Sequence, residues 1–100
     1  MKNTDEKRLN ENFGEARSLP WLKLATGFDA PELRGVIERF GVRCHDCESH
    51  IHLDDHAVRQ IRNANKDRDY LPTIEKVEEP GGIAYWLRNA MGRIIPAPSR

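Results

Sequence analysis

Residues 44–56 read CHDCESHIHLDDH, and this stretch decides how we expect the middle of the chain to fold. Both cysteines and all four histidines of the 100-residue protein lie in it. Apolar residues at positions 51 and 53 alternate with histidines at 50 and 52, which is the period-two pattern of a half-buried strand. We therefore expect a short hairpin from Val42 to Leu53, with the Cys-x-x-Cys pair at its tight turn.

The same stretch carries the residue types that bind zinc. Structural zinc sites have four thiolate or imidazole ligands in tetrahedral geometry. We assign the candidate ligands to Cys44, Cys47, His52 and His56, with His50 as an alternative to His52. A site filled by four protein ligands would be structural, with one zinc stapling a small fold. The competing interpretation is that the cysteines are small core residues and the histidines are exposed.

The spacing Cys-x2-Cys-x4-His-x3-His resembles the retroviral-type zinc knuckle, whose last ligand is a cysteine one residue further on. The resemblance covers only residues 44–56, and it implies zinc binding. Knuckles grip single-stranded nucleic acid through flanking basic residues, whereas this stretch contains Asp46, Glu48, Asp54 and Asp55. Nucleic-acid binding is therefore not carried over from the resemblance.

Helical patterns flank this stretch on both sides. Ser18 and Asp29 are placed to cap two consecutive helices, each of which stops at a glycine. The second of these has apolar residues at 33, 36, 37 and 40, the spacing of one helix face. On the C-terminal side, Asp54 or Asp55 caps a third helix with apolar residues at 57, 58, 61 and 64.

The C-terminal third is divided by a break at Pro80-Gly81-Gly82. Before the break, residues 72–79 fit a strand or a helical turn equally. After it, apolar residues at 83, 87, 90, 91 and 94 predict a fourth helix. The expected fold class is thus α+β and mainly helical, with about four short helices around a small central β-hairpin that zinc would staple.

The domain organisation follows from where charged and apolar residues lie. Residues 1–17 have high charge density, and they predict a mobile N-terminal arm or a helix that forms only when it packs. Residues 18–95 carry the apolar patterns, and they predict a single compact domain that acts as a monomer. Proline at 96 and 98 predicts a frayed tail over residues 96–100.

Composition excludes several classes of function. Lys plus Arg and Asp plus Glu are each 16, so the chain lacks the basic excess that drives nucleic-acid binding by counterion release. No apolar run is long enough to span a membrane. The polar N-terminus does not read as a signal peptide, so we expect a cytoplasmic protein. The sequence shows no catalytic motif, and we expect no enzyme.

In its length, single domain, lack of a catalytic motif and acidic patches, the chain resembles small anti-CRISPR proteins of phages and mobile elements. The resemblance implies a non-enzymatic inhibitor that binds CRISPR-associated protein subunits of a Cascade-like, type I guide-RNA surveillance complex in the host cell. Such an inhibitor blocks target DNA binding by covering basic residues of the complex. In this chain, acidic residues at expected helix starts, namely Asp29, Glu32, Asp54 and Asp55, would make those contacts.

The alternative is a small zinc-binding regulatory protein that contacts nucleic acid through its basic C-terminal helix. Residues 81–100 contain three arginines and no acidic residue, and Arg88 and Arg93 would lie on that helix. The inhibitor hypothesis predicts a stable protein complex and little affinity for free nucleic acid. The regulator hypothesis predicts salt-sensitive binding of DNA or RNA.

Overall fold

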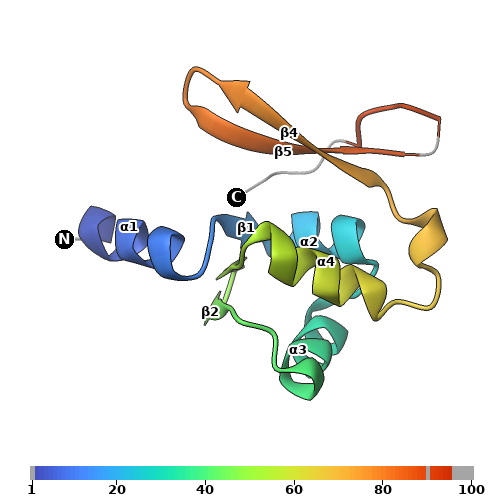
Figure 1. Ribbon diagram of the computed structural model, residues 1–100, viewed down its shortest axis with the longest axis horizontal. Coiled ribbons are helices and arrows are strands. Elements are labelled where there is room, and N and C mark those ends of the chain that lie inside the picture. Colours follow the sequence, from blue (N-terminus) through green and yellow to red (C-terminus); the bar gives the residue numbers. More distant parts are fainter. Residues whose placement is uncertain (1, 90, 96–100) are drawn as a thin grey trace.

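The structure, a computed structural model, describes the backbone of residues 2–89 and 91–95 (Figure 1). The expected α+β class, with four helices and a small hairpin between them, is confirmed within this part. The helices are α1 (Lys2–Asn12), α2 (Leu19–Thr26), α3 (Ala30–Phe40), α4 (Asp55–Asn63) and the 3₁₀ helix η1 (Arg68–Tyr70). The strands are β1 (Ala16–Ser18), β2 (His45–Cys47), β3 (His50–His52), β4 (Thr73–Glu79) and β5 (Gly82–Arg88). The expected frayed tail lies outside the described residues.

The predicted helix caps are confirmed. The side chains of Ser18, Asp29 and Asp54 each accept a hydrogen bond from the backbone N–H three residues further along, at 3.2, 3.3 and 2.8 Å. Each bond satisfies one of the donors that a helix start leaves without a partner. Helices α2 and α3 end at Gly27 and Gly41, whose φ angles of 79° and 60° are in the left-handed region that favours glycine.

A three-stranded antiparallel sheet lies at the centre of the sequence, with strand order β1-β3-β2. The expected hairpin is present, but the Cys-x-x-Cys pair does not form its turn. Cys47 pairs with His50, so Glu48 and Ser49 make the turn, and Cys44 lies just before β2. The turn places Glu48 at a φ of 46°, which a short polar side chain or glycine adopts more readily.

The core forms where this sheet packs on α2, α3 and α4. Strand β3 contributes Ile51 and is followed by Leu53, and both are fully buried. Helices α2 and α4 pack against each other and against α3. The complete set of buried hydrophobic residues is Trp21, Leu22, Ala25, Leu33, Val42, Ile51, Leu53, Ala57, Val58, Ile61 and Leu87. The presence of Leu87 shows that the C-terminal segment closes one side of this core.

The predicted helix over residues 83–94 is wrong. Residues 82–88 form β5, which pairs antiparallel with β4 across a turn at Pro80 and Gly81 (Figure 1). Positions 83, 87 and 91 are four apart, which fits one face of a helix and, because four is even, one face of a strand as well. Tyr85 and Leu87 lie on the face that packs on the core, whereas Trp86 between them is 37% exposed. The fourth helix of the fold is α1.

The N-terminal segment is a helix followed by a strand. Helix α1 extends to one side of the other elements (Figure 1). Its C-terminal end is held by Arg43, which donates two hydrogen bonds to the carbonyl oxygen of Asn12 at 3.1 and 2.8 Å. Residues 16–18 pair with β3, so the sheet includes the end of the expected arm. None of the described helices is long and apolar enough to cross a membrane.

Two glycines give a matched test of this arrangement. Gly14 has a φ of 120°, and a Cβ there would lie 2.4 Å from the backbone nitrogen of Asp54. We expect Gly14→Ala to lower the free energy of unfolding by about 2 kcal/mol or more, because strain and overlap both act. Gly35 lies in α3 with nothing within 4 Å of an added Cβ. Because alanine is favoured over glycine inside a helix, Gly35→Ala should raise the free energy of unfolding by about 0.5–1 kcal/mol. Urea unfolding of both variants measures this, and effects of the same sign would contradict the structure.

Candidate metal centre

Three metal-ligating side chains meet on one face of the β2–β3 hairpin. Cys47, His50 and His52 each offer a ligand atom, and these atoms lie within 4.8 Å of one another. Cys47 is directly opposite His50 in the strand register, and His52 is two residues along β3. Because side chains alternate along a strand, positions 50 and 52 share a face. The hairpin therefore gathers one sulfur and two imidazole donors without help from a helix.

His52 is held in an orientation suited to metal binding. Its side chain is buried, and its Nδ1 lies 3.1 Å from the carbonyl oxygen of Gly14. A carbonyl oxygen only accepts hydrogen bonds, so Nδ1 carries the proton and donates it to Gly14. The other ring nitrogen, Nε2, is then left with its lone pair. This is the arrangement in which metal-binding histidines are usually fixed by a second partner.

Two of the four predicted ligands are not in this cluster. Cys44 precedes β2 and packs against the core, and burial, followed by the nearby Asp46 carboxylate, raises the pKa of its thiol. A raised pKa disfavours the thiolate that a metal needs. His56 lies exposed in the first turn of α4. Cys44 and His56 were predicted from the spacing of ligands in the sequence alone. The register of β2 and β3 instead places His50 opposite Cys47.

His45 is the residue near the cluster that the sequence interpretation missed. It pairs with His52 in the register of β2 and β3, and the two imidazole centres are 6.4 Å apart. It stands two residues before Cys47, so it shares the face of the hairpin that carries the cluster. It is exposed, and its ring lies 5.6 Å from that of Phe13. The period-two rule, extended from β3 to β2, would have identified it.

An ion pair holds the hairpin against α3. Arg34 donates to both carboxylate oxygens of Asp46, at 2.6 and 3.1 Å, and also to the carbonyl oxygen of Glu48 at 3.1 Å. The Arg34 hydrogen bond is the main reason that the pKa of Asp46 is lowered. The pair therefore fixes β2 and the turn. Because Cys47 follows Asp46 directly in the chain, its position is fixed as well.

The four predicted partner-binding acids lie at the starts of two helices. Asp29 and Asp54 serve as the N-caps of α3 and α4. Glu32 is exposed in the first turn of α3. Asp55 pairs with Arg17 at 2.8 Å, while its side chain remains 58% exposed. Three of these side chains thus already have a partner within the fold.

The basic C-terminal helix of the regulator hypothesis is absent from the described residues. Arg88 lies in β5, where it pairs with Glu75 of β4 and donates to the carbonyl oxygen of Gly92. Arg93 follows the strand and is exposed. These two arginines therefore do not share a helix face.

The chain matches no protein-family model, no curated protein and no solved structure.

The Arg34–Asp46 pair predicts a defined pH dependence. Because the pKa of Asp46 is lowered in the folded state, the pair stabilises the fold above the pKa of the unfolded chain, about 4. This contribution is lost as pH falls through the folded pKa. Both side chains are 41% exposed, so it should not exceed about 1 kcal/mol. Asp46→Asn should lower the free energy of unfolding at pH 7, and its difference from the wild type should shrink as pH falls below about 4.

The matched control is Asp67→Asn, since the side chain of Asp67 makes no cap hydrogen bond at η1. Urea unfolding at pH 7 and pH 3 would measure both variants. A difference for Asp46→Asn that stays constant over this range would contradict the assigned cause.

Proposed function

We propose that the protein is a small zinc-binding protein, in which one Zn²⁺ closes the β2–β3 hairpin. The observation that carries this proposal is the Cys47, His50 and His52 cluster, with its ligand atoms within 4.8 Å of one another. Thiolate and imidazole are the ligands from which structural zinc sites in proteins are most often built. The orientation of His52 by Gly14 supports the same proposal, because that bond leaves Nε2 free to bind the metal.

We assign the fourth position to His45. It lies on the same face as the cluster and opposite His52. It is exposed, so rotation about its side-chain bonds brings an imidazole nitrogen toward the metal without disturbing the core. A site with one cysteine and three histidines, all from the protein, is closed and structural. The zinc would then be a part of the fold and not a reaction centre.

The strands that supply these ligands are short enough for a metal to matter. Strands β2 and β3 have three residues each, and the hairpin turn places Glu48 at a positive φ. Zinc bound to the folded state alone adds its binding free energy to folding. At a free zinc concentration 100 times the dissociation constant, this amounts to about 2.7 kcal/mol. Regulation by zinc supply would act through this term.

Zinc titration of paired variants tests the proposal. The wild type should bind one Zn²⁺ per chain, and Cys47→Ala should weaken binding by about 100-fold or more, because a ligand is lost. Cys44→Ala is the matched control, three residues away, and should retain the wild-type affinity. Among the histidines, His50→Ala should weaken binding and His56→Ala should not. Competition with a chromophoric chelator measures each affinity.

Replacement of zinc by Co²⁺ tests the coordination number. A tetrahedral site with one thiolate gives intense visible bands and a thiolate charge-transfer band, and Cys47→Ala should abolish the charge-transfer band because the sulfur ligand is lost. His45→Ala should weaken these visible bands, since water then takes the fourth position. Equal losses from Cys44→Ala and Cys47→Ala would contradict this ligand set, and the absence of binding would refute the proposed function.

The inhibitor hypothesis, binding of CRISPR-associated subunits through Asp29, Glu32, Asp54 and Asp55, stays a prediction. Its support is that these side chains are exposed at the starts of α3 and α4. A simpler role for Asp29 and Asp54 is helix capping, since each already accepts a backbone hydrogen bond. Among the four, Glu32 is therefore the sharpest residue to test.

An affinity pull-down from nuclease-treated host lysate, analysed by mass spectrometry, provides that test. If the hypothesis holds, the wild type should recover subunits of the surveillance complex, and Glu32→Lys should lose them. Glu38→Lys makes the same charge change further along the exposed part of α3 and should keep them. If both variants recovered equal amounts of the subunits, the acidic residues of α3 would not form the interface.

A further inference from the structure

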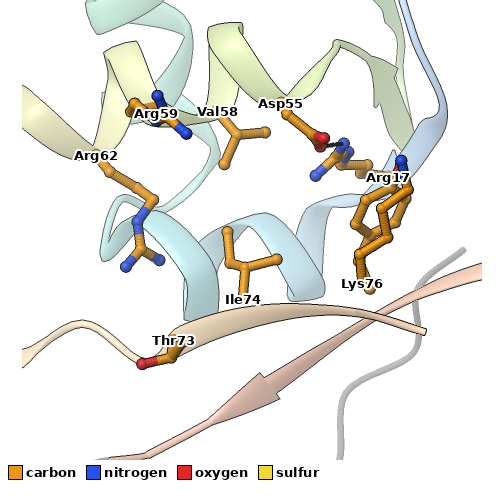
Figure 2. Close-up of a pocket in the computed structure, with 9 residues that line it drawn as sticks. Arg17, Asp55, Val58, Arg59, Arg62, Thr73, Ile74 and Lys76 are labelled. Carbon is orange, nitrogen blue, oxygen red and sulfur yellow. Dashed lines mark hydrogen bonds and ion pairs between the residues drawn. The ribbon is translucent and has the colours of Figure 1, made fainter.

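A cationic cavity of about 310 Å³ lies between α4 and the β4–β5 hairpin. Figure 2 shows Arg59 and Arg62 of α4 on one side, Ile74 of β4 facing them, and Arg17 and Lys76 at the far end. Among the described residues, the lining holds four cationic side chains, Arg17, Arg59, Arg62 and Lys76, and a single carboxylate, Asp55. No residue of the metal cluster lines it. A cavity of this size is large enough for a small organic ligand.

Arg17 has buried N–H groups that the fold does not use. Its side chain is 3% exposed, and its Nη2 donates to Asp55 at 2.8 Å. Its Nε and Nη1 are buried and have no hydrogen-bond partner among the described residues. A buried donor without a partner costs free energy, and such groups in native proteins usually serve a bound ion, a water or a ligand. Arg17 therefore offers two donors that remain to be satisfied.

Two aromatic rings hold this guanidinium in place. The Arg17 Cζ lies 4.1 Å from the centre of the Tyr85 ring and 5.1 Å from that of Trp21. Trp21 is in turn fixed to the hairpin by a 2.8 Å hydrogen bond from its Nε1 to the carbonyl oxygen of Tyr85. Cation–π contacts stabilise the charge but accept no N–H hydrogen bond in the guanidinium plane. The guanidinium is thus held in place, while its Nε and Nη1 have no hydrogen-bond partner among the described residues.

The other cations of the lining form no ion pair with the described residues. Arg62 donates to the carbonyl oxygens of Ala25 and Pro72, at 2.6 and 2.7 Å, so its position is fixed but its charge is not paired. Arg59 and Lys76 are exposed, and neither forms an ion pair with the described residues. The cavity therefore combines a buried arginine with exposed cations at its rim.

We propose that this cavity binds a phosphomonoester. Four cations against one carboxylate leave an excess that favours an anion of more than one charge, and a phosphomonoester at neutral pH is close to doubly charged. Arginine N–H groups match phosphate oxygens in geometry as well as in charge. Val58, Ile74 and Tyr85 provide apolar surface for the organic part of the ligand. The phosphate belongs either to a small metabolite such as a nucleotide or to the 5′ end of a nucleic-acid strand.

Calorimetric titration of the full-length protein distinguishes these sources. The probes are adenosine 5′-monophosphate, adenosine, and one oligonucleotide with either a 5′-phosphate or a 5′-hydroxyl group. Binding of the monophosphate but not of adenosine supports the site with a small metabolite as ligand. Binding of the 5′-phosphorylated oligonucleotide alone supports the site with a strand end as ligand. In both cases affinity should fall with added salt.

Charge-neutralising variants locate the binding. Arg59→Gln and Lys76→Gln should each weaken binding about tenfold or more, because each removes a charged contact. Arg68→Gln and Lys66→Gln make the same charge changes at exposed positions outside the cavity lining and should change affinity less than twofold. Arg17→Met tests the buried donors, but the rim variants keep the test decisive even if this variant fails to fold.

Three outcomes would overturn the proposal: no binding of any probe, equal binding of adenosine and its monophosphate, or equal weakening by cavity and control variants. No residue of the metal cluster lines the cavity, so failure of this proposal and failure of the zinc proposal are separable.

Discussion

The burial of Ile51 in the central strand is the constraint on which both the core and the candidate metal centre depend. Strand β3 buries Ile51 in the hydrophobic core, and alternation of side chains then sends His50 and His52 to the opposite face of the strand. A shift of register by one residue would put the histidines in the core and the isoleucine on the ligand face. The hydrophobic effect therefore selects the register, and the register assembles the ligands.

Features that depend on neighbours in the sequence could be predicted. Ser18, Asp29 and Asp54 cap their helices through a bond to the N–H three residues away, and each was recognisable from residue type and position. The segment after Gly82 could not be assigned in this way, because a spacing of four residues suits helix and strand alike. What makes it a strand is its pairing with β4 across Pro80 and Gly81, and single-sequence periodicity does not contain that pairing.

In the candidate sites too, some residues could be identified from neighbours in the sequence and others only from tertiary contacts. Cys47 and His52 were recognisable as candidate ligands from their spacing, and the β2–β3 hairpin brings them together. Cys44 was included because of its spacing, yet its thiol packs against the core. Arg17 attracted no notice in the sequence, since its importance comes from Asp55, Tyr85 and other partners that are distant along the chain. The spacing of ligands in the sequence gives the number of residues between them. It does not give the distances between their side-chain atoms, which the tertiary fold determines.

The cavity has one wall on α4 and the other on the β4–β5 hairpin, and few contacts join the two. The hairpin is attached to the body by the burial of Leu87, by the bond from Trp21 to the Tyr85 carbonyl and by the bond from Arg62 to Pro72. Local opening of such a segment costs less than global unfolding. An occupant of the cavity would bind the closed arrangement alone, so it would suppress this opening. Ligand binding and hairpin closure would then be coupled. A substitution that favoured opening of the hairpin would lower the affinity for the ligand, and loss of the ligand would make the hairpin open more often.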